Sequence, residues 1–220
     1  MCSTFRHPGS RLTSGRNGAP NLGVRLECPD TLSLGSNAAF DIRHTVTYDA
    51  PSSENAITLH TYTLDPASQF QMQERDGLRC YRRASDANGP EAQWPLCDLD
   101  DGEMGFLIVD APDRSIRVSE DKDFVSLRPG ESWSTTYRLH SPPSWPKLPD
   151  DLRVGDAFRC QFNGVTEVDW WDWGHVENEH ADTVVTAPCF RTRVVTPADN
   201  DGRPKLVVPA SNTVEFRVVD

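Results

Sequence analysis

The sequence lacks any long run of apolar residues. A membrane-spanning helix needs about 20 consecutive apolar residues, and no stretch of the 220 residues approaches that length. The opening residues, MCSTFRHPGSRLTSGRNGAP, also lack the apolar segment of a secretory signal. We therefore expect a cytoplasmic protein that does not enter a membrane. Residues 1–20 are expected to form a flexible or docked tail, and residues 21–220 a single domain.

Basic residues are scarce relative to acidic ones. The chain has 22 Lys and Arg against 33 Asp and Glu, which gives a formal net charge of −11 at pH 7. A strongly acidic protein is repelled by nucleic-acid backbones and by anionic membranes. Both classes of partner are therefore excluded as the principal ligand, and an unknown protein or small molecule is expected instead.

Helical periodicity is nearly absent, whereas alternation of apolar and polar residues recurs along the chain. Such alternation is typical of antiparallel strands with one buried face. Seventeen Pro and fourteen Gly fall mostly between these segments, as turns require. The pattern predicts an all-β protein, specifically an Ig-like antiparallel β-sandwich with Greek-key connections. The expected strands cover residues 22–28, 39–48, 57–64, 69–74, 106–109, 131–140, 157–162, 190–195 and 212–220.

Two long insertions interrupt this pattern, at residues 83–105 and residues 169–187. Both are polar and acidic, and the second contains three tryptophans. Long loops on a rigid sandwich commonly hold functional residues. We therefore expect any binding site to lie on one of these two insertions.

One turn resembles a motif of known β-sandwich families. The order Leu127, Pro129, Gly130, Glu131, Ser132 precedes an alternating strand, with Pro presetting the turn and Gly accepting a positive φ. It is similar to a turn of immunoglobulin-like domains, including the pro-regions of deuterolysin-type metalloproteases, bacterial adhesion modules and Bacillus-type intracellular proteinase inhibitors. The resemblance covers about fifteen residues. It implies the fold and transfers no functional residue.

The stretch EVDWWDWGHVENEH, residues 167–180, is the strongest candidate for a binding site. If it is a strand, Trp171 and Trp173 share one face and Trp170 lies on the other. Exposed tryptophans could stack on flat or cationic ligands, with His175 nearby. The alternative is that the rings only complete the core.

The same stretch offers weak candidates for a metal site. His175, Glu177 and Glu179 would align on one face of a strand, as nitrogen and oxygen ligands for zinc or manganese. The helical H-E-x-x-H pattern is absent. The favoured interpretation is therefore a solvated acidic loop without a metal, and no cofactor is expected.

Six cysteines occur, without a C-x-x-C pair. Because no export signal accompanies them, reduced thiols are expected. Cys80 and Cys97 are the best disulfide candidates in an oxidising compartment, and Cys160 is expected to act as a small buried hydrophobe. The pairing of Cys80, Cys97, Cys160 and Cys189 stays open.

Two functions lead, beside a third possibility, a structural or scaffold domain in which all three tryptophans are packed and neither loop is exposed. The first is a non-enzymatic binding module that uses the Trp-rich loop; the fold-level resemblance suggests a proteinase inhibitor as one form of it. The second is a cofactor-free isomerase or cyclase with a Trp-lined pocket, in which His175 or Asp172 serves as general acid–base.

Overall fold

The computed structural model describes residues 18–35, 39–52, 54–64, 77–84, 93–97, 111–139, 148–149, 151–165, 167–189 and 193–220. This part of the chain contains strands and three short 3₁₀ turns, with no α-helix among the described residues. No helix of the described segments is long and apolar enough to cross a membrane. The all-β prediction is confirmed.

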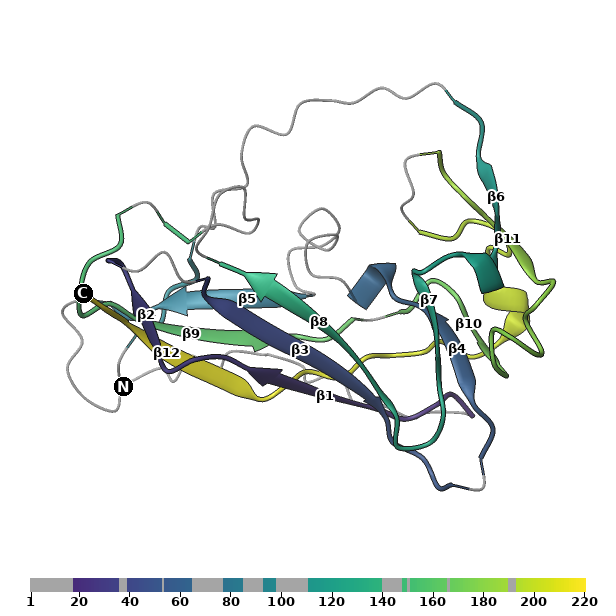
Figure 1. The fold of residues 1–220 in the computed structure, drawn as a ribbon, viewed down its shortest axis with the longest axis horizontal. Coiled ribbons are helices and arrows are strands. Elements are labelled where there is room, and N and C mark those ends of the chain that lie inside the picture. The colour runs from purple at the N-terminus through teal and green to yellow at the C-terminus, as the bar shows by residue number, and fades with distance from the viewer. Residues whose placement is uncertain are drawn as a thin grey trace, which may run out of the picture.

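Two sheets form the main sandwich (Figure 1). The first has the order β1-β3-β8, with β1 at Leu22–Glu27, β3 at Asp41–Tyr48 and β8 at Ser132–Arg138. The second has the order β2-β12-β9-β5, with β2 at Thr31–Ser33, β12 at Thr213–Val219, β9 at Ala157–Phe162 and β5 at Leu78–Arg82. Their inward faces are apolar because each strand alternates buried and more exposed residues.

Aromatic contacts between the sheets show how closely they pack. The rings of Phe40 and Phe216 lie 4.4 Å apart, and those of His44 and Phe162 lie 4.5 Å apart. All four residues are buried. One continuous core therefore fills the space between the two sheets.

The strand order is that of an immunoglobulin-like domain. In both main sheets, hydrogen-bonded neighbours are not consecutive in sequence, so the chain crosses between sheets in Greek-key fashion. Strand β2 runs parallel to the last strand, β12, whereas the other pairs of the sandwich are antiparallel. The predicted Ig-like sandwich is confirmed.

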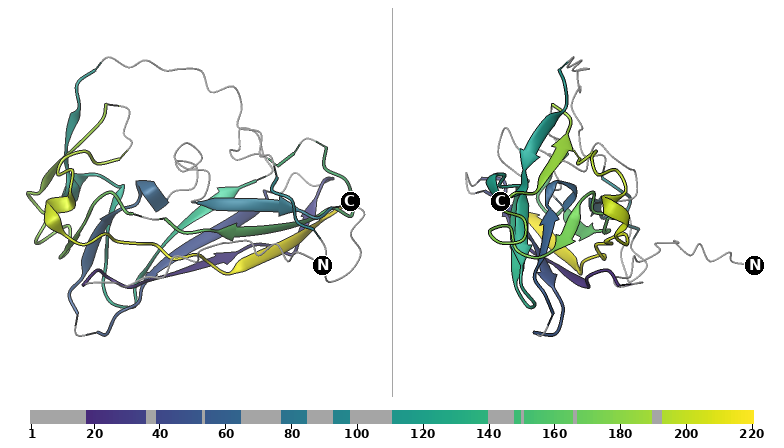
Figure 2. Two further views of the ribbon diagram at one scale, coloured as in Figure 1. Left: turned by 180° about the vertical axis from the view of Figure 1, so that it is seen from behind. Right: turned by 90° about the vertical axis from the view of Figure 1, so that its right-hand side faces the viewer.

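The long connections of the sandwich build a second group of sheets at one end (Figures 1 and 2). A three-stranded sheet has the order β10-β4-β7, with β10 at Trp171–Trp173, β4 at Ile57–His60 and β7 at Phe124–Leu127. Each of these strands comes from a different connection. Strands β6 (Arg114–Arg117) and β11 (Val184–Ala187) pair beside it. The insertion at residues 169–187 is therefore structured, and it contributes to a small second core.

The turn between β7 and β8 has the geometry predicted from its sequence. Gly130 has a φ of +83°, and its N–H donates to the carbonyl oxygen of Tyr48 across 2.8 Å. The carboxylate of Glu131 accepts the N–H of Arg128 at 2.8 Å. The Pro129–Gly130 step therefore joins the second group of sheets to the sandwich at a fixed corner.

Several expected strands differ from the structure. The segment at residues 57–64 is a strand only as far as His60, and a 3₁₀ turn follows at Tyr62–Leu64. Residues 193–195, expected to be part of a strand, form none. The expected strands at residues 69–74 and 106–109, the tail up to residue 17 and most of residues 83–105 lie outside the described residues.

Candidate functional site

The Trp-rich stretch is an edge strand inserted between two cores. Trp171 is fully buried in the main core, whereas Trp170 has 1% of its surface exposed and lies in the small core. Neighbouring residues of a strand point to opposite faces, so the two rings enter different cores. Neither ring offers a face to a ligand, which removes both from the expected aromatic platform.

Backbone and side chains near the C-terminus hold this strand in place. The N–H of Trp171 donates to the side-chain oxygen of Asn200 at 3.2 Å, and its indole N–H donates to the carbonyl oxygen of Pro204 at 2.9 Å. Arg203 donates to the carbonyl oxygen of Trp171 at 2.8 Å. It also pairs with Asp172, at 3.1 Å. Asp172 is thus engaged in an ion pair with Arg203.

Strand β10 ends at Trp173, and the rest of the stretch is a series of turns. Trp173 is half-buried, with its ring against Trp171 at 5.5 Å. The N–H of His175 donates to the Glu179 carboxylate at 2.7 Å, and this hydrogen bond lowers the pKa of Glu179. His175, Glu177 and Glu179 therefore do not align as expected. Within the described ranges, no three His, Cys, Asp or Glu side chains are gathered as metal ligands.

A buried pair, His60 and Asp169, lies at the start of the Trp-rich stretch. Nδ1 of His60 is 2.9 Å from Oδ2 of Asp169, and the Asp169 carboxylate also accepts the N–H of Val194. The His60 ring stacks on Phe124 at 4.6 Å. These contacts join β4, the start of the Trp-rich stretch and residues 193–195, so the pair serves to hold three segments together.

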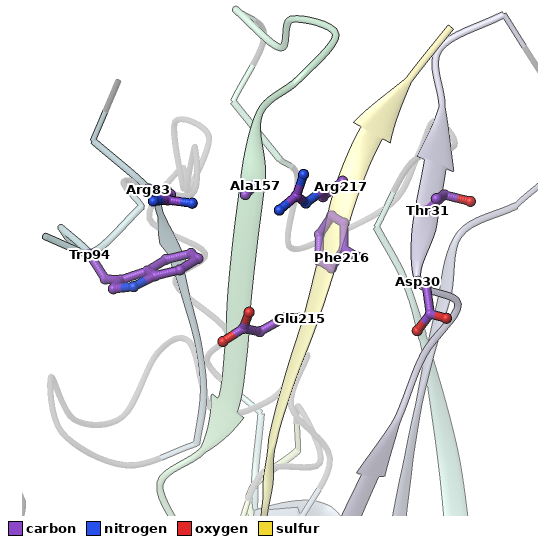
Figure 3. A pocket seen from close by; sticks show the side chains of 8 residues that line it. All are labelled: Asp30, Thr31, Arg83, Trp94, Ala157, Glu215, Phe216 and Arg217. Atoms are coloured by element: carbon purple, nitrogen blue, oxygen red, sulfur yellow. The ribbon is translucent and has the colours of Figure 1, made fainter. Parts of the chain in front are cut away.

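A pocket lined by charged and aromatic side chains lies away from the Trp-rich stretch, on the outer face of the four-stranded sheet (Figure 3). Backbone hydrogen bonds continue the pairing of β5 beyond Arg82, because Arg83 donates to Ala157 at 2.9 Å and Ala84 to Gln93 at 3.0 Å. Opposite residues on neighbouring strands share a face. One row therefore crosses the sheet in the order Trp94, Arg83, Ala157, Arg217, Thr31.

The hollow in this row arises from the small side chain at its centre. Ala157 places a single methyl group between Arg83 and Arg217, whose backbones lie two strand spacings, about 10 Å, apart. The resulting cavity has a volume of about 360 Å³. Figure 3 shows the two arginine side chains on either side of Ala157, with the Trp94 ring beside Arg83.

The neighbouring row fixes one wall of the pocket. Arg159 forms two hydrogen bonds with Glu215, at 2.9 and 2.6 Å. Its guanidinium carbon lies 4.3 Å from the centre of the Trp94 ring. Glu215 is thereby neutralised, and Trp94 is held against the sheet by a cation–π contact.

Three cysteines lie on the opposite, inward face of the same strands. Cys80 and Cys160 face each other across β5 and β9 and form a disulfide, with 4.2 Å between their Cα atoms. This corrects the expectations of reduced thiols and of Cys80–Cys97 as the best candidate pair. Cys97 is buried on the other side of Cys80.

Sequence reasoning missed the pocket because it followed the apolar face of each strand. The signal lies in the outward positions, where arginines recur in RCYRR, AFRCQF and EFRVV. Alternation places Arg83, Arg159 and Arg217 on the outer face, but the position of Arg83 and Arg217 on either side of Ala157 depends on strand register, which no local pattern determines.

These features define an all-β protein whose outer sheet face holds a small, partly cationic pocket. No family model matches the chain, and no curated protein matches its sequence. It is similar to a solved structure from Pyrococcus furiosus, the CARDB domain of a protein in complex with di-metal ions. The two chains are 12% identical over 98% of this chain and 100% of that one, with a TM-score of 0.28. A likeness at this level carries no argument about function.

Proposed function

We propose that this protein is a non-enzymatic binding module whose ligand is a small anion with an apolar or flat portion, bound in the pocket between Arg83 and Arg217. The observation that carries the proposal is the row Trp94, Arg83, Ala157, Arg217 on the outer sheet face. Guanidinium groups on two sides of a hollow suit a carboxylate or phosphate, which accepts paired hydrogen bonds from arginine.

The charges around the pocket support an anion. The lining contains two arginines, Arg83 and Arg217, and two carboxylates, Asp30 and Glu215, and Glu215 is already paired with Arg159 outside the pocket. Among the described residues, the side chain of Arg217 has no ion-pair partner. The Arg217 guanidinium beside an apolar and aromatic wall favours an amphipathic anion over a cation.

The Trp-rich stretch supports a binding function less well. Two of its three rings are buried, and the pairing of Asp172 with Arg203 weakens the case for an enzyme that uses Asp172. Trp173 and His175 are half-buried. Proteinase inhibition has no supporting contact, so we do not propose it for this chain.

The test is a charge-matched ligand series on the full chain. Calorimetric titrations with 2-naphthoate, 2-naphthamide and 2-naphthylmethylamine compare an anion, a neutral molecule and a cation of nearly one shape. We expect the carboxylate to bind at least about tenfold more tightly than the amide, corresponding to about 1.4 kcal/mol. The Arg217→Gln variant should lose a similar factor for the carboxylate alone.

The control is Arg43→Gln, which removes an exposed arginine from the outer face of the other main sheet. This variant should bind the carboxylate like the parent protein. Equal affinity for all three probes, or an equal loss in both variants, contradicts an anion site at the pocket.

A further inference from the structure

The three inward-facing cysteines lie in one row across three neighbouring strands. Cys80 in β5 is directly opposite Cys160 in β9. On the other side of β5, Tyr81 forms a bridge with Leu96, and the N–H of Cys97 donates to the carbonyl oxygen of Cys80 at 2.9 Å. This antiparallel register places Cys97 directly opposite Cys80 as well.

All three side chains point into the same core. Cys80 and Cys160 are fully buried, and Cys97 has 7% of its surface exposed. Directly opposite residues in a hydrogen-bonded antiparallel pair have Cα atoms about 5.5 Å apart, and disulfides span about 4.4–6.8 Å. Cys80 can therefore bond to either neighbour without a large movement of its strand.

We propose that Cys97, Cys80 and Cys160 form a thiol–disulfide exchange site. The Cys97 thiolate attacks Sγ of Cys80, the bond between Cys80 and Cys160 breaks, and Cys160 leaves as a thiolate that takes up the proton lost by Cys97. One disulfide and one thiol are present before and after the step, so neither an oxidant nor a reductant is consumed.

The row geometry favours this reaction. Exchange at sulfur requires the attacking and leaving sulfurs to lie on opposite sides of the sulfur under attack. Cys97 and Cys160 flank Cys80 on its two sides, because their strands pair with the two edges of β5. Burial among apolar side chains keeps other thiols away from the bond between Cys80 and Cys160.

The exchange changes which segments are cross-linked. The disulfide between Cys80 and Cys160 joins β5 to β9, which lie side by side under the pocket. A disulfide between Cys80 and Cys97 would instead join β5 to residues 93–97, the segment that carries Trp94. The inference does not depend on the ligand proposed above, since it concerns only the linkage of these strands.

Non-reducing peptide mapping of the full chain tests the proposal. Trypsin separates the three cysteines into peptides 80–82, 84–114 and 160–191, and a Cys189→Ser background leaves Cys160 as the sole cysteine of its peptide. The native protein is incubated anaerobically at pH 8.5 without added thiol, quenched with acid, alkylated and digested. We expect peptide 80–82 linked to both partners, with roughly a tenth or more of it on peptide 84–114.

Matched variants complete the design. Cys97→Ser should leave only the linkage to peptide 160–191, Cys28→Ser should leave both, and oxidised Cys160→Ser should contain the linkage to peptide 84–114. Detection of peptide 80–82 on peptide 160–191 alone in the equilibrated native protein overturns the proposal, as does the absence of both linkages. The peptide map of the equilibrated native protein tests the exchange without the Cys160→Ser variant, so the result stands even if that variant does not fold.

Discussion

Arg203 donates a hydrogen bond from Nε to the carbonyl oxygen of Trp171 across 2.8 Å. The same guanidinium contacts Asp172 at 3.1 Å, and Asn200 and Asp201 at 3.3 Å each. Its side chain is only 18% exposed. This arginine therefore joins the turn at Asn200–Gly202 to the edge strand β10, which is inserted between the two cores.

Replacing this arginine should destabilise the protein. In Arg203→Met, the Trp171 carbonyl loses its Arg203 donor and the Asp172 carboxylate loses its ion-pair partner in a poorly solvated place. We expect a loss of about 2 kcal/mol in the free energy of unfolding, measured by urea denaturation. Arg138→Met removes an exposed pair with Asp41 and should cost less than about 1 kcal/mol. Equal losses in the two variants would show that Arg203 does not anchor β10.

The tryptophans of the stretch and of the pocket should differ in their contribution to stability. Trp171→Ala empties a fully buried site and should cost about 3–5 kcal/mol. Trp94→Ala removes a half-buried ring and its contact with Arg159, which should cost about 1 kcal/mol. Denaturation midpoints of the two variants test this order. A small loss for Trp171→Ala would restore the expectation that this ring is exposed.

His44 should make the protein sensitive to acid. It is fully buried, neither ring nitrogen has a hydrogen-bond partner, and burial lowers its pKa from 6.5 to about 4. Between these pH values the unfolded chain binds a proton that the folded state does not, so stability falls as the pH is lowered. The full effect, below about pH 4, is roughly 3 kcal/mol.

The comparison with His44→Leu isolates the pH-dependent contribution of His44 to the free energy of unfolding. The difference in unfolding free energy between parent and variant should change by roughly 3 kcal/mol between pH 7 and pH 4, with the variant losing less stability. His175→Gln, which alters a half-buried histidine of the turn region, should follow the parent profile. Parallel profiles for the parent and His44→Leu would contradict a neutral, buried imidazole.

Gly174 should be irreplaceable at the end of β10. Its φ is +113°, and an added Cβ would lie 2.6 Å from Cβ of Glu179. We expect Gly174→Ala to lose about 2 kcal/mol or more in thermal or urea unfolding, because both the backbone and the contact are strained. Gly155 also has a positive φ, +96°, but open space around it. Gly155→Ala should therefore lose less, and an equal loss would argue against the contact with Glu179.

The sequence by itself determined the class of the fold. Alternation predicted strands at residues 22–28, 39–48, 131–140, 157–162 and 212–220, and the structure contains a strand within each of these ranges. Pro129 and Gly130 marked the turn before β8. These features are local, because side-chain alternation and turn conformation depend on a few neighbouring residues.

Only the tertiary structure decided where the tryptophans, the pocket arginines and the cysteines lie relative to one another. Period-two alternation places Trp170 and Trp171 on opposite faces of the strand, but it does not reveal that each face packs against a core of its own. Likewise, the register of strands distant in sequence places Ala157 between Arg83 and Arg217. The same kind of long-range register places Cys80 between Cys97 and Cys160. Register is set by the packing of the whole sandwich. The pocket and the cysteine row therefore follow from pairing energies summed over both sheets, which no short segment encodes.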